Sequence, residues 1–177
     1  MNDTQYKKVK VKTWYLKYAK NIPVFRESDH FSKWLNPDSE EYLNLYKEVG
    51  SQWGWTGHLL LLEQELKEKL NAKDNEIWLF QHLGKTIGFF EIDFSLEGKA
   101  EIVYLGLIPS EVGKGHGKEL LNTAIAVAGK GGNTVWLHTC EYDHSNALNI
   151  YLQAGFNIVD VKIEKEYYPV EFSMKKD

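Results

Sequence analysis

Glycine alternates with lysine and histidine from Gly113 to Lys118, in the string GKGHGK, which follows an apolar run and precedes a helical pattern. Glycine lets the main chain approach a ligand closely because it has no Cβ, and the lysines add positive charge. At the start of a helix, free backbone NH groups and the helix dipole both favour an anion. The segment from Val112 to Lys118 is therefore predicted to hold phosphate, with a diphosphate as its natural ligand.

The spacing of these glycines excludes two well-known phosphate loops. A Walker loop has Gly five residues before its Gly-Lys pair and Ser or Thr after it, whereas Val112 and Glu119 stand at those positions. The dinucleotide fingerprint GxGxxG does not fit either, because the string reads GxGxG. An ordinary flexible turn between a strand and a helix is the alternative that the glycines alone leave open.

Other residue types that could do chemistry lie on both sides of this loop. Glu91 stands in the string FFEIDF, and a charge among aromatic residues is costly unless it is paired or used. His116, His138, His144 and the single cysteine, Cys140, lack the spacing of a metal site and an obvious carboxylate partner, so no metal is predicted. Cys140 could act as a covalent nucleophile, although a small buried hydrophobe is the commoner role of a lone cysteine.

The elements that must position these residues follow from hydrophobic periodicity. Strands are predicted over 9–16, 77–82, 86–94, 100–108, 134–138, 157–164 and 167–174, and helices over 40–49, 59–70, 115–128 and 145–154. Turn signals at 84–85 and 97–98 make the second to fourth of these strands an antiparallel meander. The sequence therefore predicts one mixed α/β domain with an N-terminal helical part laid over it, in which Tyr46, Trp53 and Trp55 form pocket walls or simply pack.

Length and composition are those of an ordinary globular protein. The chain has 177 residues, 43% hydrophobic and 26% charged, which fits one domain with its own core. A net charge of −4 argues against a nucleic-acid surface, which needs a basic stripe. A single cysteine gives no disulfide framework, and neither a signal peptide nor a membrane span is seen. A cytoplasmic protein with no nucleic-acid or membrane partner is expected.

The order and spacing of the motifs together resemble the GNAT superfamily of acetyl-coenzyme A dependent N-acetyltransferases. The resemblance rests on the strand AEIVYLGLIP, the loop VGKGHG, a helix, the strand TVWLHTC and the segment NALNIYLQAGF. The N-terminal segment YLNLYKEVGSQWGW looks like one uncharacterised bacterial branch. The resemblance implies a GNAT fold, with a mostly antiparallel mixed sheet, a splayed strand pair and flanking helices. Residues 1–75 would form part of the acceptor side and residues 76–177 the acetyl-coenzyme A core of a single domain.

The same resemblance implies a binding site for the cofactor acetyl-CoA (coenzyme A). The pyrophosphate would lie against Val112, Gly113, Lys114, Gly115, His116, Gly117 and Lys118. Val112 departs from the Gln or Arg of the family, which removes a side-chain contact but leaves the main-chain NH groups. The backbone of Leu105, Gly106 and Leu107 would pair with the pantetheine arm as an added strand would, and Asn146 would touch that arm. Gly106 in a bulky strand fits a bulge or a close ligand approach.

Catalytic roles are also implied by the resemblance. Tyr151 would be the general acid at the thioester sulfur, because a thiol leaving group needs a proton donor and an unperturbed phenol has a pKa of about 10. Its alternative role is a core tyrosine that packs its helix. Glu101 matches the strand glutamate that acts as the base in histone-type members, and its alternative is a strand-end residue in solvent. Glu91 is the competing base, and His138 would polarise the substrate or cap its strand.

The function implied is transfer of an acetyl group from acetyl-CoA to a primary amine of a small molecule or protein, by direct attack in a ternary complex. Acidic residues near the acceptor side would attract a cationic amine; they are Glu91, Asp93, Glu101, Glu141 and Asp143. The alternative, supported only by Val112, is a non-catalytic GNAT-like module that binds or senses coenzyme A. The sequence leaves open the acceptor, the acyl-chain preference and the choice between monomer and homodimer.

Overall fold

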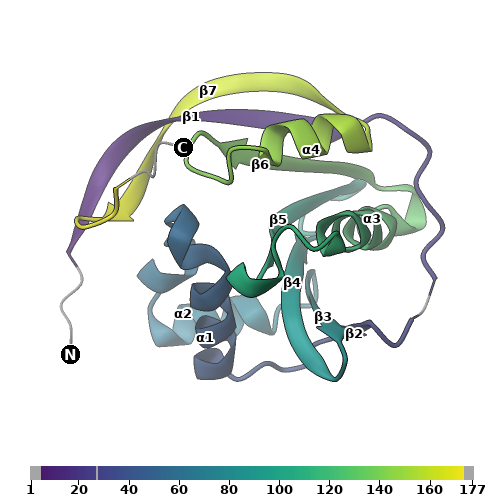
Figure 1. The fold of residues 1–177 in the computed structure, drawn as a ribbon, viewed down its shortest axis with the longest axis horizontal. Coiled ribbons are helices and arrows are strands. Elements are labelled where there is room, and N and C mark those ends of the chain that lie inside the picture. Colours follow the sequence, from purple (N-terminus) through teal and green to yellow (C-terminus); the bar gives the residue numbers. More distant parts are fainter. Residues whose placement is uncertain (1–4, 27, 174–177) are drawn as a thin grey trace.

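The computed structural model describes residues 5–26 and 28–173, and within them seven strands form one sheet (Figure 1). The strands are β1 (Tyr6–Tyr18), β2 (Phe31–Lys33), β3 (Asn75–His82), β4 (Lys85–Asp93), β5 (Lys99–Leu107), β6 (Thr134–Cys140) and β7 (Phe156–Pro169). Their order across the sheet is β2-β3-β4-β5-β6-β1-β7. Every neighbouring pair is antiparallel except β5 and β6, which run parallel. This mixed, mostly antiparallel sheet confirms the predicted fold class.

Helices cover both faces of the sheet. They are α1 (Ser39–Gly50), α2 (Glu63–Leu70), α3 (His116–Ala128) and α4 (Ala147–Ala154), with 3₁₀ turns η1 (Ser51–Trp53), η2 (Gly57–Leu60), η3 (Pro109–Glu111) and η4 (Lys130–Gly132). Side chains alternate between the two faces along a strand, so Phe89 packs with α1 and α2 while its neighbour Phe90 packs with α3. The sheet thus has a separate apolar core on each face.

The pairing of β5 with β6 stops part-way along both strands. Their parallel register runs from Lys99↔Thr134 to Ile102↔Leu137 and goes no further. From Val103 to Leu107, β5 pairs only with β4 on its other side. These two strands are the splayed pair that the resemblance implies, and the opening between them exposes one backbone edge of β5.

The C-terminal strand differs from the prediction of two short strands over 157–164 and 167–174, which is wrong. One continuous strand, β7, pairs with β1 from Tyr18↔Phe156 to Tyr6↔Pro169, with a single shift of register between Tyr15 and Leu16. The charged residues Lys165 and Glu166 resemble a turn in the sequence because β7 is an edge strand with little burial on either face. The predicted end of the second strand, Met174, lies outside the described residues.

Two further differences concern the N-terminal part. The helix predicted over 59–70 is broken, because η2 ends at Leu60 and α2 begins only at Glu63. Glu65 accepts a hydrogen bond from the backbone NH of Leu62 at 2.8 Å, which fixes this later start. The three-residue strand β2, which pairs with β3, is too short to carry a periodic signal and is missing from the prediction.

Candidate active site

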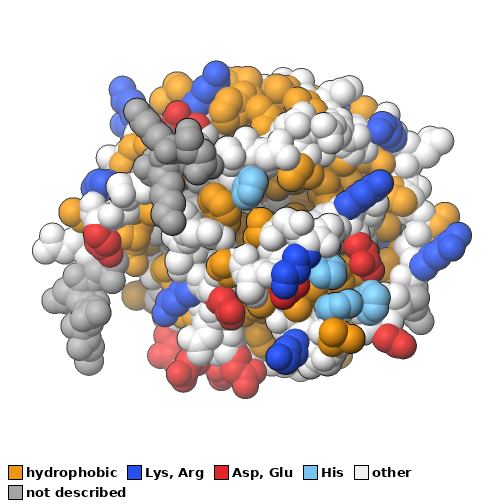
Figure 2. Space-filling view, in the orientation of Figure 1, with side chains coloured by type: hydrophobic (Ala, Val, Ile, Leu, Met, Phe, Trp, Pro, Cys, Tyr) orange, Lys and Arg blue, Asp and Glu red, His pale blue; other side chains and the backbone are white. Residues whose placement is uncertain are grey.

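A cavity of about 890 Å³ runs along the opening between β5 and β6. Its walls come from β5, the glycine loop, the first turn of α3, the outer half of β6, and α4. Its lining also includes residues of the segment between α1 and η2 and of the paired strands β1 and β7. The volume is that of a site for a cofactor or another small molecule. In the space-filling view, hydrophobic side chains show in the furrow between α3 and α4 (Figure 2).

The glycine loop borders one end of this cavity through main chain rather than side chains. Gly113 and Gly115 have φ angles of 83° and 92°, in the left-handed region that favours glycine. A Cβ added at Gly113, Gly115 or Gly117 would meet no protein atom within 4 Å, so the surface beside these residues is open. Gly115 precedes α3 without a side-chain cap, which leaves the first NH groups of the helix available to an anion.

Of the predicted loop residues, Val112, Gly113, Gly115, Gly117 and Lys118 line the cavity. The other two, Lys114 and His116, are absent from its walls. Both lie against the same carboxylate: the ammonium of Lys114 is 3.0 Å from Oε1 of Glu111, and Nε2 of His116 is 3.5 Å from Oε2. The side chains of Lys114 and His116 therefore contact Glu111 rather than the cavity.

The exposed edge of β5 forms the long wall of the cavity, and Leu105, Gly106 and Leu107 all line it. The bulge between β4 and β5 lies near Val103, since Glu91 pairs with Tyr104 and Ile92 with Ile102, so Gly106 is not the bulge. A Cβ at Gly106 would collide with Val49 of α1. The glycine is therefore required by helix packing, and the unpaired edge itself is what a ligand could use.

Helix α4 contributes Asn146 and Tyr151 to the cavity wall. The ring of Tyr151 packs edge-on against Phe156, with centroids 6.1 Å apart. Burial, together with the negative charge of Asp143, raises the pKa of the Tyr151 phenol above its ordinary value. The hydroxyl is therefore neutral at physiological pH and is available as a proton donor.

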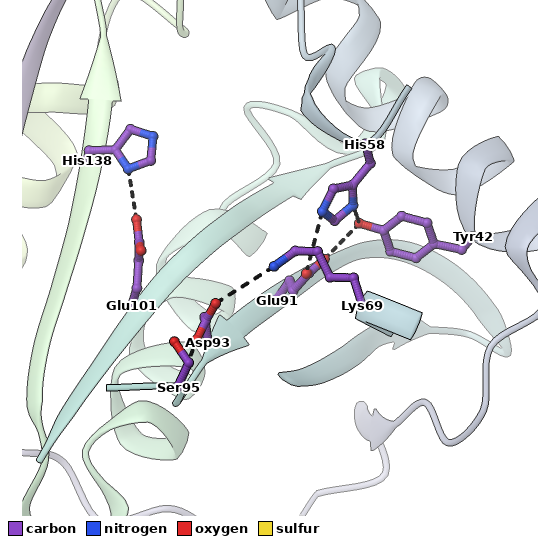
Figure 3. A network of polar contacts seen from close by, with 8 residues as sticks. All are labelled: Tyr42, His58, Lys69, Glu91, Asp93, Ser95, Glu101 and His138. Carbon is purple, nitrogen blue, oxygen red and sulfur yellow. Dashed lines mark hydrogen bonds and ion pairs between the residues drawn. The ribbon is translucent and has the colours of Figure 1, made fainter. Parts of the chain in front are cut away.

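Glu101 and His138 form a hydrogen-bonded pair at the point where the two strands separate (Figure 3). Oε1 of Glu101 lies 2.9 Å from Nδ1 of His138, which leaves Nε2 of the imidazole for another partner. His138 lines the cavity, whereas Glu101 does not. The hydrogen bond and charge of Glu101 raise the pKa of His138 in spite of burial.

The comparison with sequence families agrees with this arrangement. The profile of the Acetyltransferase (GNAT) family matches residues 29–156, which include β5, the glycine loop, α3, β6 and α4. The chain belongs to the GNAT acetyltransferase family. A comparison with curated proteins gave no match.

Solved structures similar to this GNAT chain share its fold. A GNAT-family protein from Novosphingobium aromaticivorans has a TM-score of 0.66 at 13% identity, over 93% of this chain and 67% of its own. A GNAT acetyltransferase from Colwellia psychrerythraea gives 0.63 at 16% identity, over 93% and 57%. The PaiA N-acetyltransferase of Thermoplasma acidophilum, solved with coenzyme A, gives 0.55 at 21% identity, over 78% and 97%. The present chain thus spans little more than half of the Colwellia protein, and at these identities the likeness shows the fold alone.

Glu91, predicted as a base or acceptor-binding group, is fully buried and does not line the cavity of the GNAT chain. Its Oε2 accepts a hydrogen bond from the hydroxyl of Tyr42 at 2.7 Å, and that hydroxyl is also 2.7 Å from Nδ1 of His58. Nε2 of His58 is 3.9 Å from Oε1 of Glu91, which has no hydrogen-bond partner (Figure 3). Burial raises the pKa of Glu91 to about 7 and lowers that of His58 to about 4.

Cys140 is protonated rather than activated. Burial and the charge of Asp143 raise the pKa of its thiol to about 11, and its sulfur lies 3.7 Å from the hydroxyl of Tyr168. Asp143 Oδ2 accepts hydrogen bonds from the Thr139 hydroxyl at 2.6 Å and the Cys140 backbone NH at 2.9 Å. A thiol held in this way is a poor nucleophile.

The sequence prediction missed several residues of the cavity. Tyr104, Glu166, Tyr167 and Tyr168 line it, as do Tyr46, Trp53 and Trp55, which the sequence leaves between pocket wall and packing. Glu166 and the two tyrosines reach the cavity only because β7 continues past residue 164 along β1, and no local signal shows this. Alternation from Ile102 would put Tyr104 on the same face, but the bulge near Val103 moves it to the opposite one. Ile102 packs in the core with α3, whereas Tyr104 packs in the core with α1 and α2, so the sequence pattern gives the wrong face for Tyr104.

Two other observations bear on partners. Among residues 5–26 and 28–173, no three His, Cys, Asp or Glu side chains are grouped as a metal ion would require. In the same part of the chain, no helix combines the length and the apolar character needed to cross a membrane.

Proposed function

We propose that the protein is an N-acetyltransferase that transfers the acetyl group of acetyl-CoA to a primary amine of a small molecule or protein within a ternary complex. One observation carries this proposal: a single cavity connects the glycine loop, the open edge of β5, Tyr151 and His138, whose imidazole is held by Glu101. Residues 76–177 supply the cofactor side of the cavity. Residues 1–75 supply part of the acceptor side, through Thr13 and the 53–57 segment.

The cofactor would be held mainly by backbone groups. The main-chain NH groups from Val112 to Lys118 would bind the pyrophosphate, with the ammonium of Lys118 beside them. The edge of β5 from Leu105 to Leu107, unpaired toward β6, would hydrogen-bond the amides of the pantetheine arm, with Asn146 on the opposite wall. Val112 offers no polar side chain, so Lys118 is the loop side chain that contributes charge to the cavity.

The chemistry follows from which groups face the cavity. Nε2 of His138 would take a proton from the substrate ammonium, and Glu101 would hold the imidazole and stabilise its cation. The free amine attacks the acetyl carbonyl carbon, the new C–N bond forms and the C–S bond breaks. Tyr151 donates its phenolic proton to the leaving sulfur and regains one from the solvent or the product amine. Glu101 thus acts through His138, which lines the cavity, and Glu91 lies outside it.

The proposal is tested with purified protein and acetyl-CoA. Calorimetry measures the binding of coenzyme A, and free thiol release is followed with a broad mixture of primary amines. Amine-dependent thiol release that is lost in His138→Ala supports the proposal. Tight binding of coenzyme A without thiol release for any amine favours the alternative, a non-catalytic module, and absence of binding overturns both.

A further inference from the structure

The acceptor end of the cavity is walled by aromatic rings. Those that line it are Tyr46, Trp53, Trp55, Tyr104, Tyr167 and Tyr168. The rings pack against one another: the centroid of the Tyr104 ring is 5.0 Å from that of Tyr46 and 5.0 Å from that of Trp55. Aromatic faces held in this way favour a flat apolar group, by stacking or edge-on contact.

Few charges accompany these rings. Asp143 and Glu166 are the acidic residues that line the cavity, and the lysine that lines it, Lys118, belongs to the glycine loop at the other end. One oxygen of Asp143 is already used by Thr139 and Cys140. Glu166 has no side-chain hydrogen bond or ion pair within the described part of the chain. The carboxylates at the acceptor end can therefore balance about one ammonium group, near His138.

We propose that the acceptor is a monoamine whose single amino group is carried on a flat aromatic body. This inference rests on the proposed function and narrows its acceptor. The aromatic body would lie among the rings and the ammonium would be directed toward His138 by Asp143 and Glu166. A polyamine or an aminoglycoside carries several cationic groups, and each one brought among the rings without a carboxylate would lose hydration that nothing replaces.

Trp53 is the aromatic residue whose substitution best tests whether these rings bind the acceptor. It lies between α1 and η2, is partly exposed, and contacts the His144 ring with centroids 5.1 Å apart. Trp55, in contrast, fills the space beside Gly50 and Gly106, so its replacement would disturb packing. Trp14 is the control outside the cavity: it lies on β1 with the ammonium of Lys12 over its ring, and because it also packs against the core, thermal unfolding must first show that Trp14→Leu is folded.

The experiment compares kcat/KM for 2-phenylethylamine, a linear alkylamine of similar length, spermidine, an aminoglycoside and a lysine-containing peptide. We expect kcat/KM for 2-phenylethylamine to exceed that for each of the other amines by about tenfold, because an aromatic contact contributes on that scale. Trp53→Leu should remove most of the preference for 2-phenylethylamine over the alkylamine while the KM for acetyl-CoA stays constant. Trp14→Leu should preserve that preference.

The proposed role of Glu166 in binding the ammonium group is tested with two variants on β7, one inside the cavity and one outside it. Glu166→Gln should raise the KM for 2-phenylethylamine about tenfold, as expected for loss of a charged partner. Glu164→Gln is the control, because Glu164 lies outside the cavity and accepts a hydrogen bond from Tyr15 at 3.0 Å. Equal effects of the two variants would remove Glu166 from the acceptor site.

Faster acetylation of spermidine, the aminoglycoside or the peptide would overturn the inference while leaving the proposed function intact. An unchanged preference in Trp53→Leu would overturn it as well. If no amine releases thiol, the proposed function fails, but binding of the amines still tests whether the site prefers an aromatic monoamine. Calorimetry on the protein saturated with coenzyme A must then show 2-phenylethylamine bound more tightly than spermidine, and the reverse order would overturn it.

Discussion

Nδ1 of His138 lies 2.9 Å from Oε1 of Glu101, and the two residues flank the last paired residues of β5 and β6, Ile102 and Leu137. The imidazole is therefore fixed where the strands begin to separate, at the inner end of the opening that holds the cavity. The same break in the sheet exposes the edge of β5 proposed to bind the cofactor and positions the proposed base, His138.

The first prediction concerns the pH dependence that this pair produces. Because Glu101 raises the pKa of His138, the loss of its charge in Glu101→Gln should lower that pKa. The base is active when deprotonated, so the rising limb of kcat/KM against pH should move to lower pH, and the plateau should fall. His138→Ala should lower kcat by about 10²-fold or more. A limb that stays at the same pH in Glu101→Gln would show that His138 is not the group that titrates.

The second prediction concerns the general acid. Tyr151→Phe retains the ring that packs on Phe156 but removes the hydroxyl. We expect kcat to fall by about tenfold to a hundredfold, since general acid catalysis contributes at this scale, while the affinity for coenzyme A stays the same. Steady-state kinetics and calorimetry separate the two quantities. Unchanged turnover would leave Tyr151 with a packing role only.

The third prediction separates cofactor contact from backbone strain in the glycine loop. Gly117 lies in the first turn of α3, and an added Cβ would meet no protein atom within 4 Å. Gly117→Ala should therefore keep or slightly raise the stability of the unliganded protein, by up to about 1 kcal/mol, because alanine favours a helix. The affinity for coenzyme A should fall by about tenfold if the ligand occupies that open space, a change of about 1.4 kcal/mol.

Gly115→Ala is the contrasting variant for the same loop. Gly115 has a φ of 92°, so alanine should cost the folded protein about 1 kcal/mol in addition to weakening coenzyme A binding. Thermal unfolding without ligand and calorimetry with ligand measure the two effects. Full affinity for coenzyme A in Gly117→Ala would remove this residue from the pyrophosphate site.

The fourth prediction concerns stability and Glu91. The pKa of Glu91 is about 7 in the folded state against an ordinary value of 4.5, so the folded protein binds more protons between these values. Stability from this residue is therefore lost as the pH rises from 4.5 to 7, by on the order of 3 kcal/mol. Glu91→Gln, which stays neutral, should be more stable than the natural protein above pH 7. Urea unfolding over a series of pH values measures this.

His58 provides the internal check, because its contribution has the opposite sign. Its pKa is about 4 in the folded state against 6.5 ordinarily, so stability from His58 increases as the pH rises from 4 to 6.5. In the natural protein the two slopes oppose each other, and Glu91→Gln should expose the rising slope of His58 alone. Parallel stability curves for the natural protein and Glu91→Gln would contradict this account of the buried pair.

The sequence was sufficient for the fold class and for the elements that surround the glycine loop, because these have strong local signals. Apolar β-branched runs, turn residues and helical spacing determine β3 to β6 and α3 without reference to the rest of the chain. The continuous β7 was not predictable in this way, since its edge position lets Lys165 and Glu166 remain exposed within a strand. Local pattern cannot distinguish such residues from a turn.

The candidate site shows the same division. The loop glycines and the α4 residues lie in short motifs, so the resemblance of those motifs to the GNAT superfamily predicts them, and the structure places them around one cavity. The contact of Glu101 with His138, and the separation of Glu91 from the cavity, depend on strand register and on which face of a strand each side chain occupies. A shift of one residue would reverse the faces, and composition carries no information about that register.

The position of β1 has a consequence for how the protein is made. Val11 and Leu16 are fully buried in the folded protein, yet the neighbours of β1 in the sheet are β6 and β7, which are synthesised long after it. During translation this first strand must therefore stay unpaired, with its apolar side chains uncovered, while the meander of β3 to β5 already has its partners. Closure of the sheet is then a late, non-local and comparatively slow step, and the nascent chain is exposed to aggregation or chaperone capture until it occurs.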